Sequence, residues 1–250
     1  MPAEKATAIV LRTIDFSETS LVVTLYTREF GKVGALAKGA KRLKGPFESA
    51  LDLLAVCRIV FLRKSSESLD LVTEAKLVRR FRPPGRDLAG LYGGYYVAEL
   101  LSGLTHDYEA SPELFDLADQ TLAELATGKA VGRRVARFEL SLLRLLGQLP
   151  SLERCGECGV AVEPSGRVHF GHLSGGVLCT RCRDGKTHVA SISANVLRAM
   201  SQLADRDDRR WRRLEIDART GGQLRGVMNH YMAHVLGKKP RVQAYLKWTT

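Results

Sequence analysis

Residues 20–37 read SLVVTLYTREFGKVGALA, and this stretch decides the fold of the N-terminal part of the chain. Apolar Leu21, Val23 and Leu25 alternate with serine, threonine and tyrosine at intervening positions. A period of two residues predicts a β-strand that buries one face. Gly31 interrupts the alternation, which then resumes, so the stretch predicts two strands joined by a short turn.

The same period extends on both sides of this stretch, from Lys5 to Phe81, and breaks at polar turns. The expected strands are residues 6–14, 20–27, 32–37, 53–63 and 69–80. Five short strands in so few residues leave no room for crossover helices, so a small antiparallel barrel is expected. The OB-fold is the commonest five-stranded solution, and an SH3-like barrel is the alternative.

A change of period marks the end of the expected barrel. Pro83, Pro84 and Gly85 stop the last strand, and the apolar spacing then becomes 3.6 residues. The sequence therefore predicts an α+β multidomain chain, in which a five-stranded OB-fold barrel precedes an α-helical bundle that carries an inserted cysteine-rich module. The expected boundaries are 1–82 for the barrel, 83–150 and 189–250 for the two parts of the helical domain, and 151–188 for the module.

The cysteines of the module have the spacing Cys155-x2-Cys158-x20-Cys179-x2-Cys182. A tight turn lets each Cys-x-x-Cys pair aim two sulfurs at one tetrahedral ion, so the spacing predicts one structural Zn²⁺ per chain. An iron–sulfur cluster and a redox dithiol are the alternatives. A closed four-cysteine site has no open position for water, so its expected role is to fold the module.

Several histidines are further potential metal ligands. His169 and His172 lie between the cysteine pairs, and either could replace a cysteine. His230 and His234 are one helical turn apart, as in zinc-protease helices, but Tyr231 stands where those helices have glutamate. The last two histidines are therefore expected to be partly exposed neighbours on a helix.

The charge of the chain favours a polyanionic partner. The 38 basic and 27 acidic residues give a net charge of +11. Residues 1–82 hold 15 basic and 9 acidic side chains, residues 83–150 hold 6 and 9, and residues 151–250 hold 17 and 9. Lysine and arginine placed against phosphates release condensed counterions, so nucleic acid is the expected partner of the basic ends.

The expected barrel contains the candidate nucleic-acid-binding residues. Four cations fall within the seven residues from Lys38 to Lys44, where a barrel would border its oligonucleotide face. A solvated loop is the alternative for this run. Phe30 and Phe47 lie near loops and are candidates for stacking on bases. The predicted binding residues are Lys38, Lys41, Arg42, Lys44, Arg63, Lys64, Arg79 and Arg80.

Motifs of catalysis are missing from the sequence. A phosphate-binding P-loop is excluded because Thr180 stands where its first glycine should be, and no G-x-S-x-G elbow occurs. Cys57 lies in an apolar run and is expected to be a buried thiol. We therefore expect no enzymatic activity. The sequence has no apolar run of ~18 residues and no signal-peptide pattern, so a cytoplasmic protein without a membrane partner is expected.

Three stretches resemble the RecO family of bacterial recombination mediator proteins. They are GKVGALAKGAKR at 31–42, LVTEAKLV at 71–78 and YMAHVLG at 231–237. The order of barrel, helical bundle, four-cysteine module and C-terminal helix also resembles that family over nearly the full chain. By this resemblance Lys38, Lys41 and Arg42 belong to a DNA face, and the four cysteines hold zinc.

The resemblance implies a nucleoid-associated protein that binds single- and double-stranded DNA. Its implied partners are RecR and the C-terminal tail of single-stranded-DNA-binding protein, and its implied outcome is the loading of RecA and the annealing of strands. A zinc-ribbon adaptor that touches RNA on a ribosome or polymerase is the alternative function. A metal-dependent hydrolase is a third hypothesis.

Overall fold

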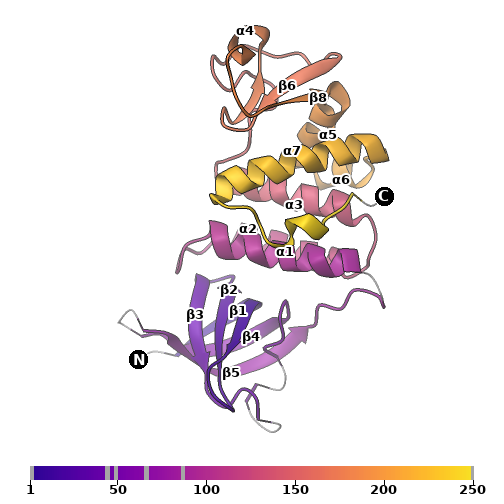
Figure 1. The fold of residues 1–250 in the computed structure, drawn as a ribbon. Helices are drawn as coiled ribbons and strands as arrows, with labels where there is room; N and C mark the ends of the chain where they lie inside the picture. The colour runs from indigo at the N-terminus through magenta and orange to yellow at the C-terminus, as the bar shows by residue number, and fades with distance from the viewer. Residues whose placement is uncertain (1–2, 43–45, 48–49, 65–67, 86–87, 249–250) are drawn as a thin grey trace. The chain divides into compact units, whose positions relative to one another are not determined.

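The computed structural model describes residues 3–42, 46–47, 50–64, 68–85 and 88–248. The chain divides into two compact units, Met1–Thr127 and Gly128–Thr250 (Figure 1). The four-segment division that the sequence suggests stays a prediction. Among the described residues, no helix has both the length and the apolar content that a membrane-spanning helix needs.

The first unit begins with a closed barrel of five strands in the order β1-β2-β3-β5-β4. The strands are β1 (Ala3–Asp15), β2 (Leu21–Thr27), β3 (Gly31–Ala37), β4 (Val56–Leu62) and β5 (Asp70–Arg79). The long strand β1 pairs with β2 through its second half and with β4 through its first half, and β3 runs parallel to β5. This connectivity is that of the OB-fold, so the predicted fold class is confirmed.

The barrel is filled by small and branched side chains on the inward positions of its strands. Val23, Leu25 and Val33 are fully buried, as the alternation predicts. Cys57 is also fully buried, and burial raises the pKa of its thiol to about 12, so it serves as a small apolar side chain. The fourth strand begins later than expected because residues 51–54 form a turn in which Leu54 has φ 64°.

Two helices complete the first unit, α1 (Leu88–Leu104) and α2 (Pro112–Leu125). Ser111 caps α2 by accepting a hydrogen bond from the Leu114 N–H, and Pro112 occupies the first turn. The ring of Phe115 on α2 stacks against Tyr26 of the barrel with ring centroids 6.4 Å apart. The helix therefore packs directly against the barrel.

The buried face of α1 is formed largely by glycine and small side chains. Leu91 and Tyr95 are only partly buried, whereas Gly90, Gly94 and Tyr96 are buried. A Cβ atom on Gly94 would lie 2.5 Å from the ring of Phe81, so glycine lets the helix approach the segment that leaves β5. The helical spacing of apolar side chains cannot identify a buried helix face that is formed by glycine.

The second unit is built on helices α3 (Val131–Leu145), α5 (Ala194–Ala204) and α7 (Ala218–Leu236). α3 contacts both α5 and α7, and α5 contacts α7. Glu139 on α3 and Arg225 on α7 form a buried ion pair at 2.5 Å. Two short elements follow α5 and α7, namely the helix α6 (Asp208–Arg212) and the 3-10 helix η1 (Val242–Tyr245).

A cysteine-rich module is inserted between α3 and α5. It contains β6 (Arg167–Gly171), β7 (Gly176–Leu178), the short helix α4 (Thr180–Arg183) and β8 (Val189–Ser193). β6 and β7 form an antiparallel hairpin, and β8 pairs with the other edge of β6. Phe170 of β6 is fully buried and meets the Tyr231 ring of α7 edge to face at 5.9 Å, so the module shares its core with a helix.

Candidate metal centre and nucleic-acid interface

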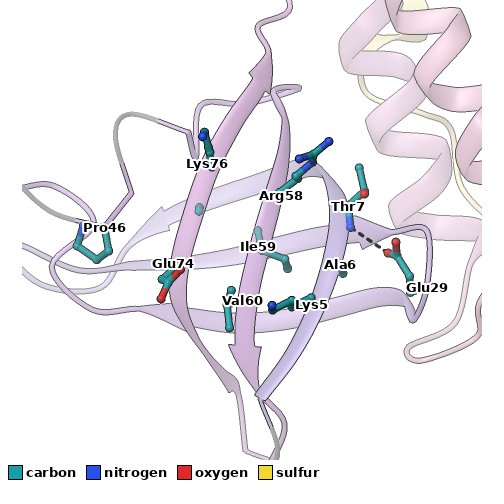
Figure 2. A pocket seen from close by; sticks show the side chains of 11 residues that line it. Lys5, Ala6, Thr7, Glu29, Pro46, Arg58, Ile59, Val60, Glu74 and Lys76 are labelled. Carbon is teal, nitrogen blue, oxygen red and sulfur yellow. Dashed lines mark hydrogen bonds between the residues drawn. The ribbon is translucent and has the colours of Figure 1, made fainter.

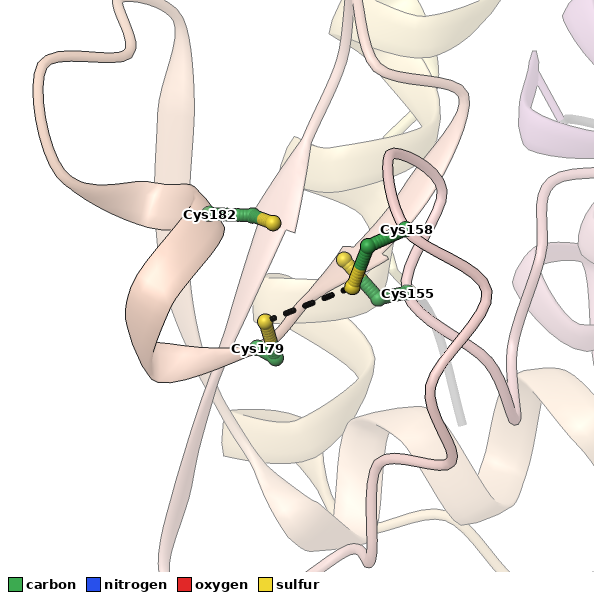
Figure 3. Close-up of side chains that lie close together, drawn as sticks. All are labelled: Cys155, Cys158, Cys179 and Cys182. Atoms are coloured by element: carbon green, nitrogen blue, oxygen red, sulfur yellow. Dashed lines mark hydrogen bonds between the residues drawn. The ribbon is translucent and has the colours of Figure 1, made fainter.

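The four cysteines of the module converge on one point (Figure 3). All four sulfur atoms lie within 4.8 Å of one another, and the sulfurs of Cys158 and Cys179 are 3.8 Å apart. Metal–sulfur bonds of about 2.3 Å in a tetrahedron give sulfur–sulfur distances of about 3.8 Å. The cluster therefore has the size of a four-sulfur metal site and could hold a metal ion.

Backbone turns aim the sulfurs at this point. Gly159 has φ +71° and donates its N–H to the carbonyl of Cys155, which closes the first Cys-x-x-Cys turn. Cys179 stands at the N-terminus of α4, and its carbonyl accepts from the Arg183 N–H. The Gly156 N–H donates to Val177 in β7 at 2.9 Å, so the two turns are held together by backbone.

The protonation of the thiols also favours a cation. Burial raises the pKa of Cys155, but hydrogen bonds from backbone N–H groups, led by that of Cys158, outweigh burial and lower it to about 6. Hydrogen bonds with Cys158 and Cys179 raise the pKa of Cys182 to about 12. Four thiols this close cannot all ionise unless a positive charge lies among the sulfurs, and a divalent metal ion supplies that charge.

Neither histidine inside the loop takes the place of a cysteine. The ring of His169 contacts the guanidinium of Arg183. The ring of His172 lies 5.6 Å from that of Phe170 and 5.2 Å from that of His230 on α7. Because the four sulfurs already form the cluster, the site is closed, and it offers no open position to a substrate among the described residues.

The basic segment, residues 38–42, follows β3 and lies against the β1–β2 turn. The Lys41 N–H donates to the carbonyl of Thr19 at 3.0 Å, and the Gly39 N–H donates to the Ser20 hydroxyl at 3.3 Å. Lys38, Lys41 and Arg42 are exposed, and Lys41 pairs with exposed Asp15 at 2.7 Å. Three predicted cations are thus gathered at one edge of the barrel, while predicted Lys44 lies outside the described residues.

The other predicted binding residues lie elsewhere on the first unit. The guanidinium of Arg63 stacks over the Tyr108 ring at 4.2 Å, and the Lys64 N–H donates to the Asp70 carboxylate at 2.8 Å.

Two predicted arginines at the end of β5 already have carboxylate partners. Arg79 pairs with Asp119 of α2, and Arg80 lies 3.8 Å from Asp52. Arg63, Lys64, Arg79 and Arg80 thus contact protein groups outside the basic segment, and their binding of nucleic acid stays a prediction.

A groove on the outer face of β1, β4 and β5 contains cations that the sequence reading missed (Figure 2). Its volume is about 560 Å³, and Lys5, Arg58 and Lys76 line it together with Glu29 and Glu74. Lys5, Arg58, Glu74 and Lys76 occupy outward positions on three paired strands, and Glu29 lies in the turn after β2. Alternation along each strand could have placed them outward, but only the pairing of the strands brings them together.

Few aromatic side chains remain accessible for stacking on bases. Phe47 is 3% exposed and belongs to the barrel core, and Phe30 packs edge to face on Phe61 at 5.4 Å. The expectation that Phe30 and Phe47 could stack on bases is therefore wrong for Phe47, because its own ring is buried in the barrel core. Phe16, in the β1–β2 turn, is 64% exposed.

Comparison with known proteins agrees with this architecture. The family model described as Recombination protein O N terminal matches residues 1–81, and Recombination protein O C terminal matches residues 85–244. A protein named DNA repair protein RecO from Rhodopirellula baltica is 40% identical over 262 residues, which cover 96% of this chain and 97% of the relative. A protein of the same name from Anaeromyxobacter dehalogenans is 31% identical over 246 residues, which cover 98% and 96%. The chain belongs to the RecO family.

Proposed function

We propose that this chain is a non-enzymatic DNA-binding mediator of recombination and repair. It binds single- and double-stranded DNA, and it acts with RecR and the C-terminal tail of single-stranded-DNA-binding protein to load RecA and to anneal complementary strands. Family membership and the names of the relatives support this proposal. A cytoplasmic, nucleoid-associated location follows from the same role.

The observation that carries the proposal is the basic segment at the edge of a closed OB-fold barrel. Lys38, Lys41 and Arg42 are exposed, and the N–H groups of Lys41 and Gly39 hold their segment against the β1–β2 turn. Loops at this edge bind oligonucleotides in OB-folds, and exposed Phe16 in the same turn offers a ring on which a base can stack.

Phosphate neutralisation supplies the mechanism. Each cation that meets a phosphate releases a condensed counterion, which stabilises the complex and lowers the repulsion between two bound strands. Pairing of complementary bases can then nucleate without covalent chemistry, and no nucleotide hydrolysis is required.

The metal in the four-cysteine cluster is a structural Zn²⁺, one per chain. Four thiolates in a closed tetrahedral set are typical of structural zinc, and the ion links Cys155 and Cys158 to the turn that begins α4. Its role is to hold the module folded, because the three-stranded sheet is small.

The test is the binding of labelled single-stranded DNA across a salt series. Changing Lys38, Lys41 and Arg42 together to alanine should weaken binding and lower the slope of log affinity against log salt by about 2, at roughly 0.7 per lost phosphate contact. The matched comparison changes Lys5, Arg58 and Lys76 in the groove to alanine, which removes the same charge from the same barrel.

Equal losses in the two variants would show that net charge, rather than the basic segment, determines affinity. An unchanged slope in the Lys38, Lys41 and Arg42 variant would contradict the proposed DNA face. Structured RNA that strongly outcompetes single-stranded DNA would favour the RNA-adaptor function instead.

A further inference from the structure

The second unit contains a group of histidine rings that is separate from the four-cysteine cluster. A cavity of about 440 Å³ is lined by His172, His188 and His230, together with polar Ser191 and Gln223. His172 follows β6, His188 precedes β8, and His230 lies on α7. The cysteine-rich module and the last long helix therefore both line this cavity.

His172 is the buried member of this group. The residue is only 8% exposed, and the Nδ1 atom of its ring has no hydrogen-bond partner among the described residues. A buried ring nitrogen without a partner loses its hydration without compensation. A ligand in the cavity that His172 lines would remove that cost.

The spacing of the two closest rings suits a shared metal ion. The ring centroids of His172 and His230 are 5.2 Å apart. With nitrogen–metal bonds of about 2.0–2.1 Å, two imidazoles on one tetrahedral ion place their ring centres roughly 5 Å apart.

His230 already has the hydrogen bond that prepares a histidine for metal binding. Its Nδ1 lies 2.9 Å from the carbonyl oxygen of Gly226, one turn earlier on α7. A carbonyl can only accept, so Nδ1 carries the proton and the neutral ring keeps its lone pair on Nε2. Metal-bound histidines commonly donate their other N–H to a backbone carbonyl in this way.

The charge state of the group favours a cation over an anion. Burial, followed by repulsion from His230, His188 and His234, lowers the pKa of His172 to about 4. Among the described residues, the titratable groups whose charge acts on His172 are His188, before β8, and His230 and His234, on α7. An anion would need an imidazolium, whereas a neutral imidazole offers a lone pair to a metal ion.

We propose that His172, His188 and His230 form a second metal site, for a divalent d-block cation such as Zn²⁺. Among the described residues the four cysteines are the only set of three or more ligand atoms already within 4.8 Å, so exposed His188 has to turn inward to join the other two rings. The ion then ties the module to α7, independently of the four cysteines.

The test is a Co²⁺ titration of the full chain after its own metal has been removed. Thiolate ligands give intense charge-transfer absorption, whereas nitrogen ligands give only weak visible bands, so the two sites report separately. The chain should bind about two Co²⁺, the first with charge transfer and the second without. His230→Gln should weaken the second event at least about tenfold and leave the first unchanged.

Two further variants complete the design. His172→Ala should likewise weaken the binding of the second Co²⁺. The charge-transfer band shows whether the four-cysteine site of this variant has stayed intact. His106→Ala changes an exposed histidine of the first unit and should keep both events. Saturation of the parent at one Co²⁺, or an unaltered second event in both His172→Ala and His230→Gln, would overturn the proposal.

Discussion

Gly31 shows how a single residue connects the barrel to the helices of the first unit. It has φ +71°, and a Cβ atom there would lie 2.1 Å from the carbonyl oxygen of Glu109. The following residue, Lys32, donates to the carbonyls of Ser102 and Thr105 at the end of α1. The start of β3 is thus fastened to the connection between α1 and α2 by close backbone approach and by one lysine.

We therefore predict that Gly31→Ala destabilises the first unit by at least about 2 kcal/mol, because a left-handed backbone and a backbone clash coincide. Urea unfolding followed by circular dichroism measures this loss. Gly34→Ala is the matched control, since its Cβ would meet only a leucine methyl group at 3.4 Å and its effect should stay below about 1 kcal/mol. Equal losses in both variants would contradict the role assigned to Gly31.

His172 gives a second prediction at the scale of one residue, concerning acid. Its folded-state pKa of about 4 lies below the ordinary value of 6.5, so the folded chain resists its protonation. Below pH 6.5 the unfolded chain binds a proton at His172 that the folded chain does not. The free energy of unfolding is therefore undiminished above pH 6.5 and falls as the pH drops toward 4, by up to about 3 kcal/mol. While no metal ion occupies the histidine group, the imidazole Cε1–H resonance, assigned by its loss in His172→Gln, should titrate near 4. Titration near 6.5 would show that the ring is not buried as described.

The cysteine-rich module is the element whose folding we expect to depend on a metal ion. Its three strands are short, and its turns depend on four thiols that cannot all ionise alone. A module with so small a core has little stability of its own.

Replacing Cys155 with serine should therefore loosen residues 150–185 while the barrel stays folded. Hydrogen exchange and limited proteolysis should show faster exchange and new cleavage within this range, and chelation of the metal should have the same effect. Thr180→Ala, a change on α4 next to a ligand, serves as the control and should leave the pattern unaltered. Unchanged proteolysis in Cys155→Ser would contradict a structural role for the ion.

At the scale of the whole molecule, the distribution of charge favours one class of binding partner. The net charge of +11 comes from residues 1–82 and 151–250, whereas residues 83–150 carry more acidic than basic side chains. This charge favours polyanionic partners, and an affinity built on many phosphate contacts depends steeply on salt.

We predict that the chain anneals complementary single strands without ATP, and that the rate falls steeply as salt rises. A fluorescence-quenching assay with labelled strands measures the rate. Non-complementary strands are the control, since they separate annealing from aggregation. A requirement for ATP, or a rate that does not respond to salt, would show that phosphate neutralisation is not the mechanism.

Sequence alone determined the type and order of the main elements. Alternation such as that of Leu21, Val23 and Leu25 depends only on which face of a strand is buried, and cysteine spacing depends only on the geometry of a tight turn. These local patterns predicted the barrel, the change to helices after Gly85 and the four-sulfur cluster.

Tertiary structure decided what depends on partners distant in the chain. It placed Gly94 against Phe81, buried Phe47, paired Arg79 with Asp119 of α2, and brought His172 to His230. The local sequence around a residue does not say which distant residue will lie opposite it, because burial and charge pairing arise only when separate segments meet.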